Sequence, residues 1–124
     1  MINVLIVEDN EMNRDMLTRR LERKGYQVCV AIDGLHGIEM ARSQNPDIIL
    51  MDVALGDMDG WEVTTRLRAD EGTKNIPVIA LTAHALETDR RKSIEVGCVD
   101  FETKPVSLTE LVEKIERHAI KRTA

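Results

Sequence analysis

Aromatic residues are scarce in this chain of 124 residues, which has one Trp, one Tyr and one Phe, or 2% of the total. A core must therefore be built from Ile, Val, Leu, Met and Ala, within a hydrophobic fraction of 43% that is ordinary for a globular protein. The scarcity also argues against a flavin site, because there are too few rings to sandwich the cofactor.

Long apolar runs and paired cysteines are also missing. No stretch approaches the ~20 apolar residues of a membrane-spanning helix, and the N-terminus lacks the charged and apolar regions of a signal peptide. Cys29 and Cys98 form no C-x-x-C pair, so we expect two buried thiols rather than a disulfide. These absences predict a cytoplasmic protein without a membrane span.

Basic residues are not in excess, since 17 Lys and Arg stand against 22 Asp and Glu and the net charge is −5. This balance argues against direct DNA binding, because a phosphate backbone is bound by a basic surface. The length, without a linker or an internal repeat, predicts a single domain over residues 1–124.

Strand and helix patterns alternate along the chain. Apolar runs predict strands at 2–7, 26–30, 48–52, 76–81 and 98–101, and an amphipathic or capped helical segment follows each of them. This alternation is typical of an α/β protein with a parallel sheet and right-handed crossovers. We expect a doubly wound (βα)5, flavodoxin-like fold with strand order 2-1-3-4-5.

Polar residues mark where these helices begin and end. Asp33 and Asp59 are placed to cap the second and third helices, and Ser107 forms a capping box with Glu110 at the last one. Gly97 is expected to end the fourth helix, over 86–96.

Three carboxylates follow strands that should lie side by side. Glu8 and Asp9 close the first strand, and Asp52 closes the third, which is apolar enough to be buried on both faces. The first and third strands are neighbours at the switch point of a doubly wound sheet. Such a cluster needs a cation, and hard oxygen ligands with room for water suit Mg²⁺.

A hydroxyl and an ammonium close the remaining two strands. Thr82 follows the fourth strand and Lys104 follows the fifth. An aspartate, a divalent metal, a lysine and a threonine around one pocket form a phosphoryl-transfer site, in which the aspartate can be the acceptor.

The chain resembles the receiver domain of bacterial response regulators over essentially its whole length. The matching motifs are VEDN at 7–10, MD at 51–52, LTA at 81–83 and KP at 104–105. Each motif alone is common, but all four in order on five β-α units are specific. The segments 9–13 and 80–85 look most like receivers of hybrid kinases and single-domain cell-division regulators.

The resemblance implies that Asp52 accepts a phosphoryl group from a phosphohistidine on a sensor or hybrid histidine kinase, or on a histidine phosphotransfer protein. Asp9 would bind Mg²⁺ directly, Glu8 through water, and the backbone carbonyl of Ala54 would complete the metal site. Lys104 would pair with the phosphoryl oxygens. The protein would be a signalling switch that catalyses its own phosphorylation and dephosphorylation, not an enzyme in the ordinary sense.

The resemblance also implies a switching mechanism. Thr82 would hydrogen-bond the phosphoryl group, and Phe101 would turn inward as the switch aromatic. Lys104 and Pro105 would be joined by a cis peptide bond. The surface of the fourth helix, fifth strand and fifth helix would then change its contacts with a downstream protein target. We expect a monomer or a weak dimer.

The sequence departs from the family pattern in the loop after Asp52. Gly56 stands where a proline is usual, which suggests a more mobile loop. Ala54 and His84, each two residues after a site residue, match positions that, in the family the chain resembles, tune how water reaches the acyl phosphate.

Other interpretations stay open at this point. An aspartate-nucleophile phosphatase would need an acid at position 54, where this chain has Ala54. A phosphorylation-independent binding module on the same fold is the stronger alternative. Independently of this choice, Phe101 could be a simple core residue, since a phenylalanine on a strand is usually packed. The histidines His36, His84 and His118 are expected at the surface.

Overall fold

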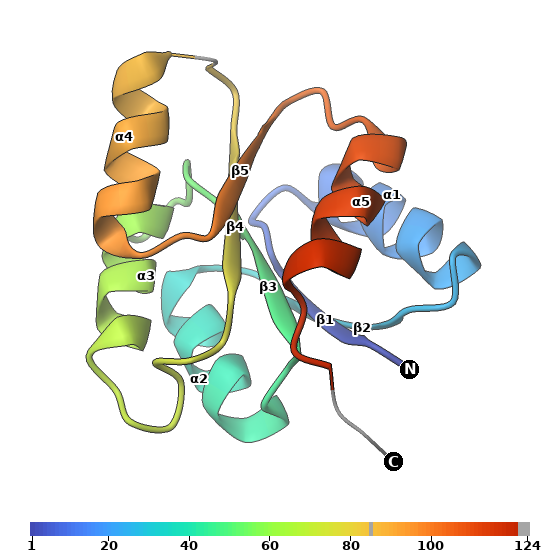
Figure 1. Cartoon of the computed structure of the whole chain (residues 1–124), viewed down its shortest axis with the longest axis horizontal. Helices are drawn as coiled ribbons and strands as arrows, with labels where there is room; N and C mark the ends of the chain where they lie inside the picture. The colour runs from blue at the N-terminus through green and yellow to red at the C-terminus, as the bar shows by residue number, and fades with distance from the viewer. Residues whose placement is uncertain (85, 122–124) are drawn as a thin grey trace.

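A computed structural model describes residues 1–84 and 86–121 (Figure 1). Five strands and five helices alternate in these ranges, and their bounds are β1 Asn3–Val7, α1 Glu11–Arg23, β2 Gln27–Ala31, α2 Gly34–Gln44, β3 Ile48–Asp52, α3 Gly60–Arg68, β4 Val78–Thr82, α4 Glu87–Val96, β5 Asp100–Thr103 and α5 Leu108–His118. The predicted alternation of strand and helix is confirmed.

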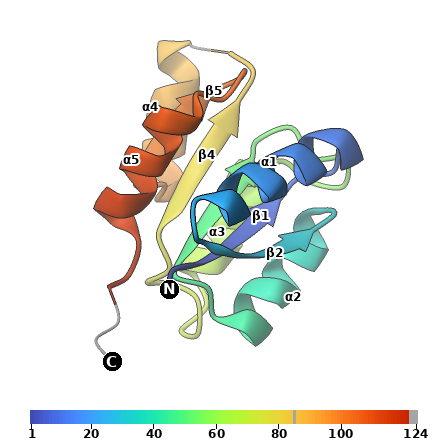
Figure 2. The same ribbon diagram turned by 90° about the vertical axis from the view of Figure 1, so that its right-hand side faces the viewer.

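The strands form one parallel sheet in the order β2-β1-β3-β4-β5, as expected for a flavodoxin-like fold. Helices α1 and α5 cover one face, and α2, α3 and α4 cover the other (Figures 1 and 2). The central strand β3 is buried along its whole length, in agreement with its continuous apolar sequence. None of the helices in residues 1–84 and 86–121 is long and apolar enough to cross a membrane.

The core has two parts, one on each side of the sheet. Side chains alternate along β1, so that Val4 and Ile6 pack with α1 and α5, whereas Leu5 and Val7 pack with α2 and α3. Aliphatic residues fill both parts, and Tyr26 is the one aromatic residue among the buried core residues that the structure describes.

The expected helix caps are present. The side chains of Asp33, Asp59 and Ser107 each accept a backbone N–H from the first turn of α2, α3 and α5, respectively. Asn10 caps α1 in the same way, which the sequence analysis did not foresee. Gly97 ends α4 with a left-handed backbone conformation (φ 106°), as predicted.

The fifth strand was predicted two residues too early. It spans Asp100–Thr103 and not 98–101, because its pairing with β4 begins where the amide of Val99 donates to the carbonyl of Val78 at 2.8 Å. Cys98 is buried before the strand begins. Three of the four residues of β5 are polar, so the strand forms no apolar run in the sequence. This composition is typical of an edge strand, and three of the four side chains are only half-buried.

Candidate functional site

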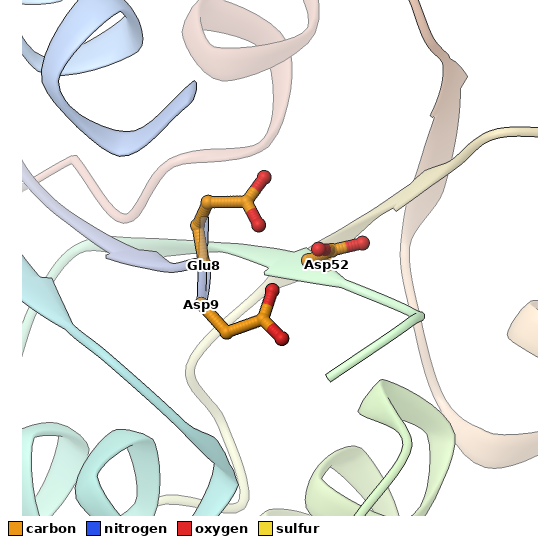
Figure 3. Close-up of side chains that lie close together, drawn as sticks. All are labelled: Glu8, Asp9 and Asp52. Atoms are coloured by element: carbon orange, nitrogen blue, oxygen red, sulfur yellow. The ribbon is translucent and has the colours of Figure 1, made fainter. Parts of the chain in front are cut away.

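The carboxylates of Glu8, Asp9 and Asp52 meet at the carboxyl ends of β1 and β3, as predicted. Each offers an oxygen, and these oxygens lie within 4.8 Å of one another. Both β1 carboxylates point toward Asp52 (Figure 3). Glu8 and Asp52 are each only 3% exposed, whereas Asp9 is exposed to solvent. The cluster is therefore buried at Glu8 and Asp52 and open to solvent at Asp9.

Strand pairing brings these residues together. Val7 pairs with Met51, so the residues that follow them, Glu8 and Asp52, end neighbouring strands at the same level. The amide of Glu8 donates to the carbonyl of Ala31 at 3.1 Å, which extends the pairing with β2 by one residue. The position of the cluster thus follows from the register of the central strands.

Lys104 bridges two of the three carboxylates. Its Nζ lies 3.0 Å from Oε1 of Glu8 and 3.2 Å from Oδ1 of Asp52. The Lys104–Pro105 peptide bond is cis, as expected from the resemblance, and the amide of Lys104 donates to the carbonyl of Thr82 at 2.7 Å. One cation therefore balances part of the negative charge at the end of β1 and β3.

The charges shift each other's proton affinity. Burial raises the pKa of Glu8 to about 7, and the nearby Asp52 carboxylate adds to this rise while Lys104 opposes it. For Lys104, burial alone would lower the pKa, but the hydrogen bond with Glu8 and the charge of Asp52 raise it above its ordinary value. Lys104 is consequently charged near neutral pH, whereas Glu8 exchanges between its protonated and ionised forms around that pH.

The donor set fits a hard divalent cation. Three carboxylates offer oxygens at the spacing of a shared site, and one lysine does not neutralise all of them. The solvent-exposed side of Asp9 leaves room for the water ligands that Mg²⁺ retains.

The loop between β3 and α3, residues 53–59, lies along the open side. The amide of Ala54 donates to Oδ1 of Asp52 at 3.1 Å and so orients the carboxylate. At the far end of the loop, the Gly60 amide donates to the carbonyl of Val53 at 2.9 Å. A Cβ at Gly60 would clash with the carbonyl oxygen of Asp52, so only glycine permits this close approach.

Thr82 lies at the end of β4 and is 3% exposed. Its hydroxyl accepts the amide of His84 at 3.2 Å and is 3.3 Å from the His84 carbonyl, to which it can donate. The Thr82 hydroxyl is thus occupied by its own loop, in which Ala85 lies outside the described residues. The side chain of His84 is exposed, as expected.

Phe101 lies apart from the acidic cluster. It is half-buried on β5, where it pairs with Ala80 and packs against the core on the α2–α4 side of the sheet. The guanidinium of Arg90 on α4 lies 6.0 Å from the centre of its ring. Phe101 therefore joins β5 to α4.

Some residues at the site were missed by the sequence analysis. The amide of Asn10 donates to Oε2 of Glu8 at 3.2 Å, and Arg14 donates to the backbone carbonyl of Glu8 at 3.0 Å. Asn10 followed a strand and preceded a helix, which was a readable capping signal. Nothing in the helical pattern marked Arg14.

Two of the three histidines that were expected at the surface are half-buried and make hydrogen bonds. His118 on α5 lies 3.0 Å from Oδ2 of Asp100, and Nδ1 of His36 accepts the amide of Ile32 at 3.1 Å. Cys98 is buried and Cys29 is half-buried, and neither forms a disulfide.

The fold and the site define an α/β protein with a carboxylate–lysine cluster at the switch point of a flavodoxin-like sheet. The chain belongs to the family of response regulator receiver domains, whose model matches residues 4–116. It is a receiver domain of two-component signalling, a switch rather than a classical enzyme, and its acidic cluster is consistent with a phospho-acceptor site.

Three relatives illustrate the similarity. The polar-differentiation response regulator DivK of Brucella ovis is 39% identical over 116 residues, or 94% of each chain. The receiver domain of a sensor histidine kinase from Pseudomonas aeruginosa, solved with a magnesium ion coordinated in its active-site cleft, is 37% identical with a TM-score of 0.87, covering 94% of this chain and 96% of that one. The receiver domain of Ssk1 from Saccharomyces cerevisiae, solved in complex with the histidine phosphotransfer protein Ypd1, is 33% identical with a TM-score of 0.87, covering 95% and 88%.

Proposed function

We propose that Asp52 accepts a phosphoryl group from a phosphohistidine in a Mg²⁺-dependent reaction. The observation that carries this proposal is Lys104, whose Nζ reaches both Asp52 (3.2 Å) and Glu8 (3.0 Å) at the mouth of an acidic cluster. A lone buried aspartate would be a structural residue. An aspartate beside two further carboxylates and a bridging lysine has the charges that phosphoryl transfer requires.

The reaction forms one bond and breaks another. A carboxylate oxygen of Asp52 attacks phosphorus, the P–N bond of the donor breaks, and the imidazole nitrogen leaves with the electron pair and takes up a proton. The hydrogen bond from the Ala54 amide (3.1 Å) and the ion pair with Lys104 hold Asp52 in one orientation for this attack. Because its pKa is raised, Lys104 stays charged and can pair with the new phosphoryl oxygens.

The residues suited to hold Mg²⁺ are Asp9, Asp52 and Glu8, with the backbone carbonyl of Ala54. When bound, the ion neutralises charge on the transferring phosphoryl oxygens. The coordinated magnesium of the related Pseudomonas aeruginosa receiver supports this assignment.

Donor and target proteins would use different surfaces. A groove of about 510 Å³ adjoins the site between α1 and the β5–α5 connection, and Glu8, Lys104, Met16 and Leu108 are among its lining residues. We expect a histidine kinase or a histidine phosphotransfer protein to approach there. The complex of the related Ssk1 receiver with Ypd1 supports a partner of this kind.

The readout would lie on the face formed by α4, β5 and α5. The Thr82 hydroxyl would exchange its contacts with His84 for a phosphoryl oxygen, and the end of β4 would then move toward Asp52. Phe101 and its Arg90 contact on α4 would carry this shift to the surface. Ala54 and His84 flank the route by which water reaches the phosphoryl group, so they would set its lifetime.

The test is phosphorylation by labelled acetyl phosphate, with and without Mg²⁺. The wild-type chain should retain label only when Mg²⁺ is present, and Asp52→Asn should retain none. Asp59→Asn is the matched control, since Asn caps a helix as well as Asp does and this residue caps α3. Label retained by Asp52→Asn, or lost equally by both variants, would refute the assignment of Asp52. A wild-type chain that takes up no label with Mg²⁺ present would favour a phosphorylation-independent binding module.

A further inference from the structure

The loop at 53–59 is attached to a helix that does not belong to the phosphoryl-transfer machinery. The carboxylate of Asp57 accepts the amides of Gly34 at 2.8 Å and Leu35 at 3.0 Å, both in the first turn of α2. The hydrogen bond from Gly34, together with that from Leu35, holds the pKa of Asp57 below its usual range. The carboxylate is therefore charged, and it accepts both hydrogen bonds at neutral pH.

The start of α2 is built to receive this residue. Its own cap, Asp33, accepts the amide of His36 at 2.8 Å, which leaves the two preceding amides to Asp57. A Cβ at Gly34 would lie 2.6 Å from Cγ of Met58 and 2.9 Å from Cγ2 of Val63, so the absence of a side chain at Gly34 lets the loop pack closely against the helix.

Leu55 in the middle of the loop packs against the core, but its two neighbours make no such contact with the core residues that the structure describes. Gly56 carries no side chain, and both Ala54 and Gly56 are exposed. This part of the loop nevertheless lies against the acidic cluster, because a Cβ at Gly56 would be 3.5 Å from Oδ2 of Asp9. Any movement of the loop therefore changes the distance between the Ala54 backbone and Asp9.

We propose that Asp57 is a positioning residue for the metal site: by fastening the loop to α2, it fixes the Ala54 carbonyl relative to Asp9 and Asp52. The contact also links the loop back to the acidic cluster by a second route. Helix α2 follows β2, and the β2 carbonyl of Ala31 accepts the amide of Glu8 at 3.1 Å. The inference rests on the proposed Mg²⁺ site. It adds a residue that touches neither the ion nor the phosphoryl group.

The test is the Mg²⁺ dissociation constant, measured by calorimetry on the full chain without any phosphodonor. Asp57→Ala should weaken binding about fivefold, the equivalent of a typical lost helix cap. Asp57→Asn removes the same charge but keeps one of the two acceptor oxygens, so its affinity should lie between those of the wild type and Asp57→Ala. Adding Gly56→Ala to Asp57→Ala should recover about two- to fivefold, because alanine restricts the loop and its Cβ fits.

Asp70→Ala is the matched control. Asp70 is also an aspartate that accepts a backbone amide, that of Gly72 at 2.9 Å, but it belongs to the α3–β4 connection. It should leave Mg²⁺ affinity unchanged, and urea unfolding should show every variant folded. Equal weakening by Asp57→Asn and Asp57→Ala would assign the effect to charge alone and overturn the inference, as would wild-type affinity in Asp57→Ala. A wild-type chain that binds no Mg²⁺ would overturn the proposed metal site, and the inference with it.

Discussion

Lys104 is the cation that pairs with both Glu8 and Asp52, so the effect of its removal on the free energy of unfolding can be calculated. At an effective dielectric of about 20, each of its ion pairs, at 3.0 and 3.2 Å, has a Coulomb energy of about 5 kcal/mol. The cost of desolvating the partners offsets much of this. Removing one partner of a buried pair typically costs about 3–5 kcal/mol. Because the Lys104 side chain is 25% exposed, we expect Lys104→Met to lower the free energy of unfolding by about 3 kcal/mol at pH 8.

The loss should depend on pH through Glu8. Its pKa is raised to about 7 in the folded chain, so the protonated form is favoured by folding. A raised pKa contributes stability that is complete below the ordinary value of about 4.3 and is lost as the pH rises through the folded value. Without Lys104 the pKa of Glu8 rises further, and Glu8 is neutral at pH 6. Lys104→Met should therefore be less destabilised at pH 6 than at pH 8.

Urea unfolding at both pH values, with and without Mg²⁺, measures these effects. A bound cation replaces the missing charge, so Mg²⁺ should restore stability to Lys104→Met, by about 2.7 kcal/mol at a concentration 100 times the dissociation constant. Lys114→Met is the control, because Lys114 is 22% exposed and its ion pairs, with Glu102 at 2.8 Å and Asp100 at 3.8 Å, do not involve the acidic cluster. Mg²⁺ also stabilises Lys114→Met, whose acidic cluster is intact, so both variants are compared at one fixed Mg²⁺ concentration, where Lys104→Met should gain more because it has lost the competing cation. An equal gain in the two variants at that concentration, or an unchanged stability of Lys104→Met at pH 8, would contradict the reasoning.

Two further predictions concern the supports of the site and of the core. Gly60→Ala should lower the free energy of unfolding by about 1–3 kcal/mol, because its Cβ would meet the Asp52 carbonyl oxygen, whereas Gly72→Ala, which meets only a flexible side chain at 3.5 Å, should change urea unfolding little. Burial and a hydrogen bond of 2.5 Å to Glu116 raise the pKa of Tyr26. Unfolding free energy should therefore fall above about pH 10, as the unfolded tyrosine ionises first, and this fall should be smaller in Tyr26→Phe, where the buried Cys98 thiol, whose pKa is also raised, still contributes.

The fold was predictable because its signals are periodic and local. The run at 48–51 is apolar throughout and, with Asp52, forms the fully buried strand β3, and the caps at Asp33, Asp59 and Ser107 are short-range patterns. The acidic cluster was predictable because its residues follow two strands that the expected strand order places side by side, so their carboxyl ends meet at one edge of the sheet. The predicted position of β5 was wrong by two residues, because an edge strand rich in polar residues resembles a loop in sequence.

Contacts between elements far apart in the sequence could not be predicted. Asp57 and Gly34 are 23 residues apart, and an aspartate in a turn carries no mark of the helix it will meet. Trp61 lies at the start of α3, and its indole donates to Ser93 on α4 at 3.0 Å, a contact that no local pattern indicates. The loop that looked mobile from Gly56 is anchored by such a contact.

The identity of the phosphoryl acceptor is tested most directly by mass spectrometry after incubation with a phosphorylated histidine phosphotransfer protein and Mg²⁺. Asp52 follows a buried strand, beside Lys104 at 3.2 Å. We expect the mass of the wild-type chain to increase by one phosphoryl group, located on the peptide that contains Asp52, and the mass of Asp52→Asn to stay unchanged. A phosphoryl group on another residue, or none on the wild-type chain, would contradict the proposed function.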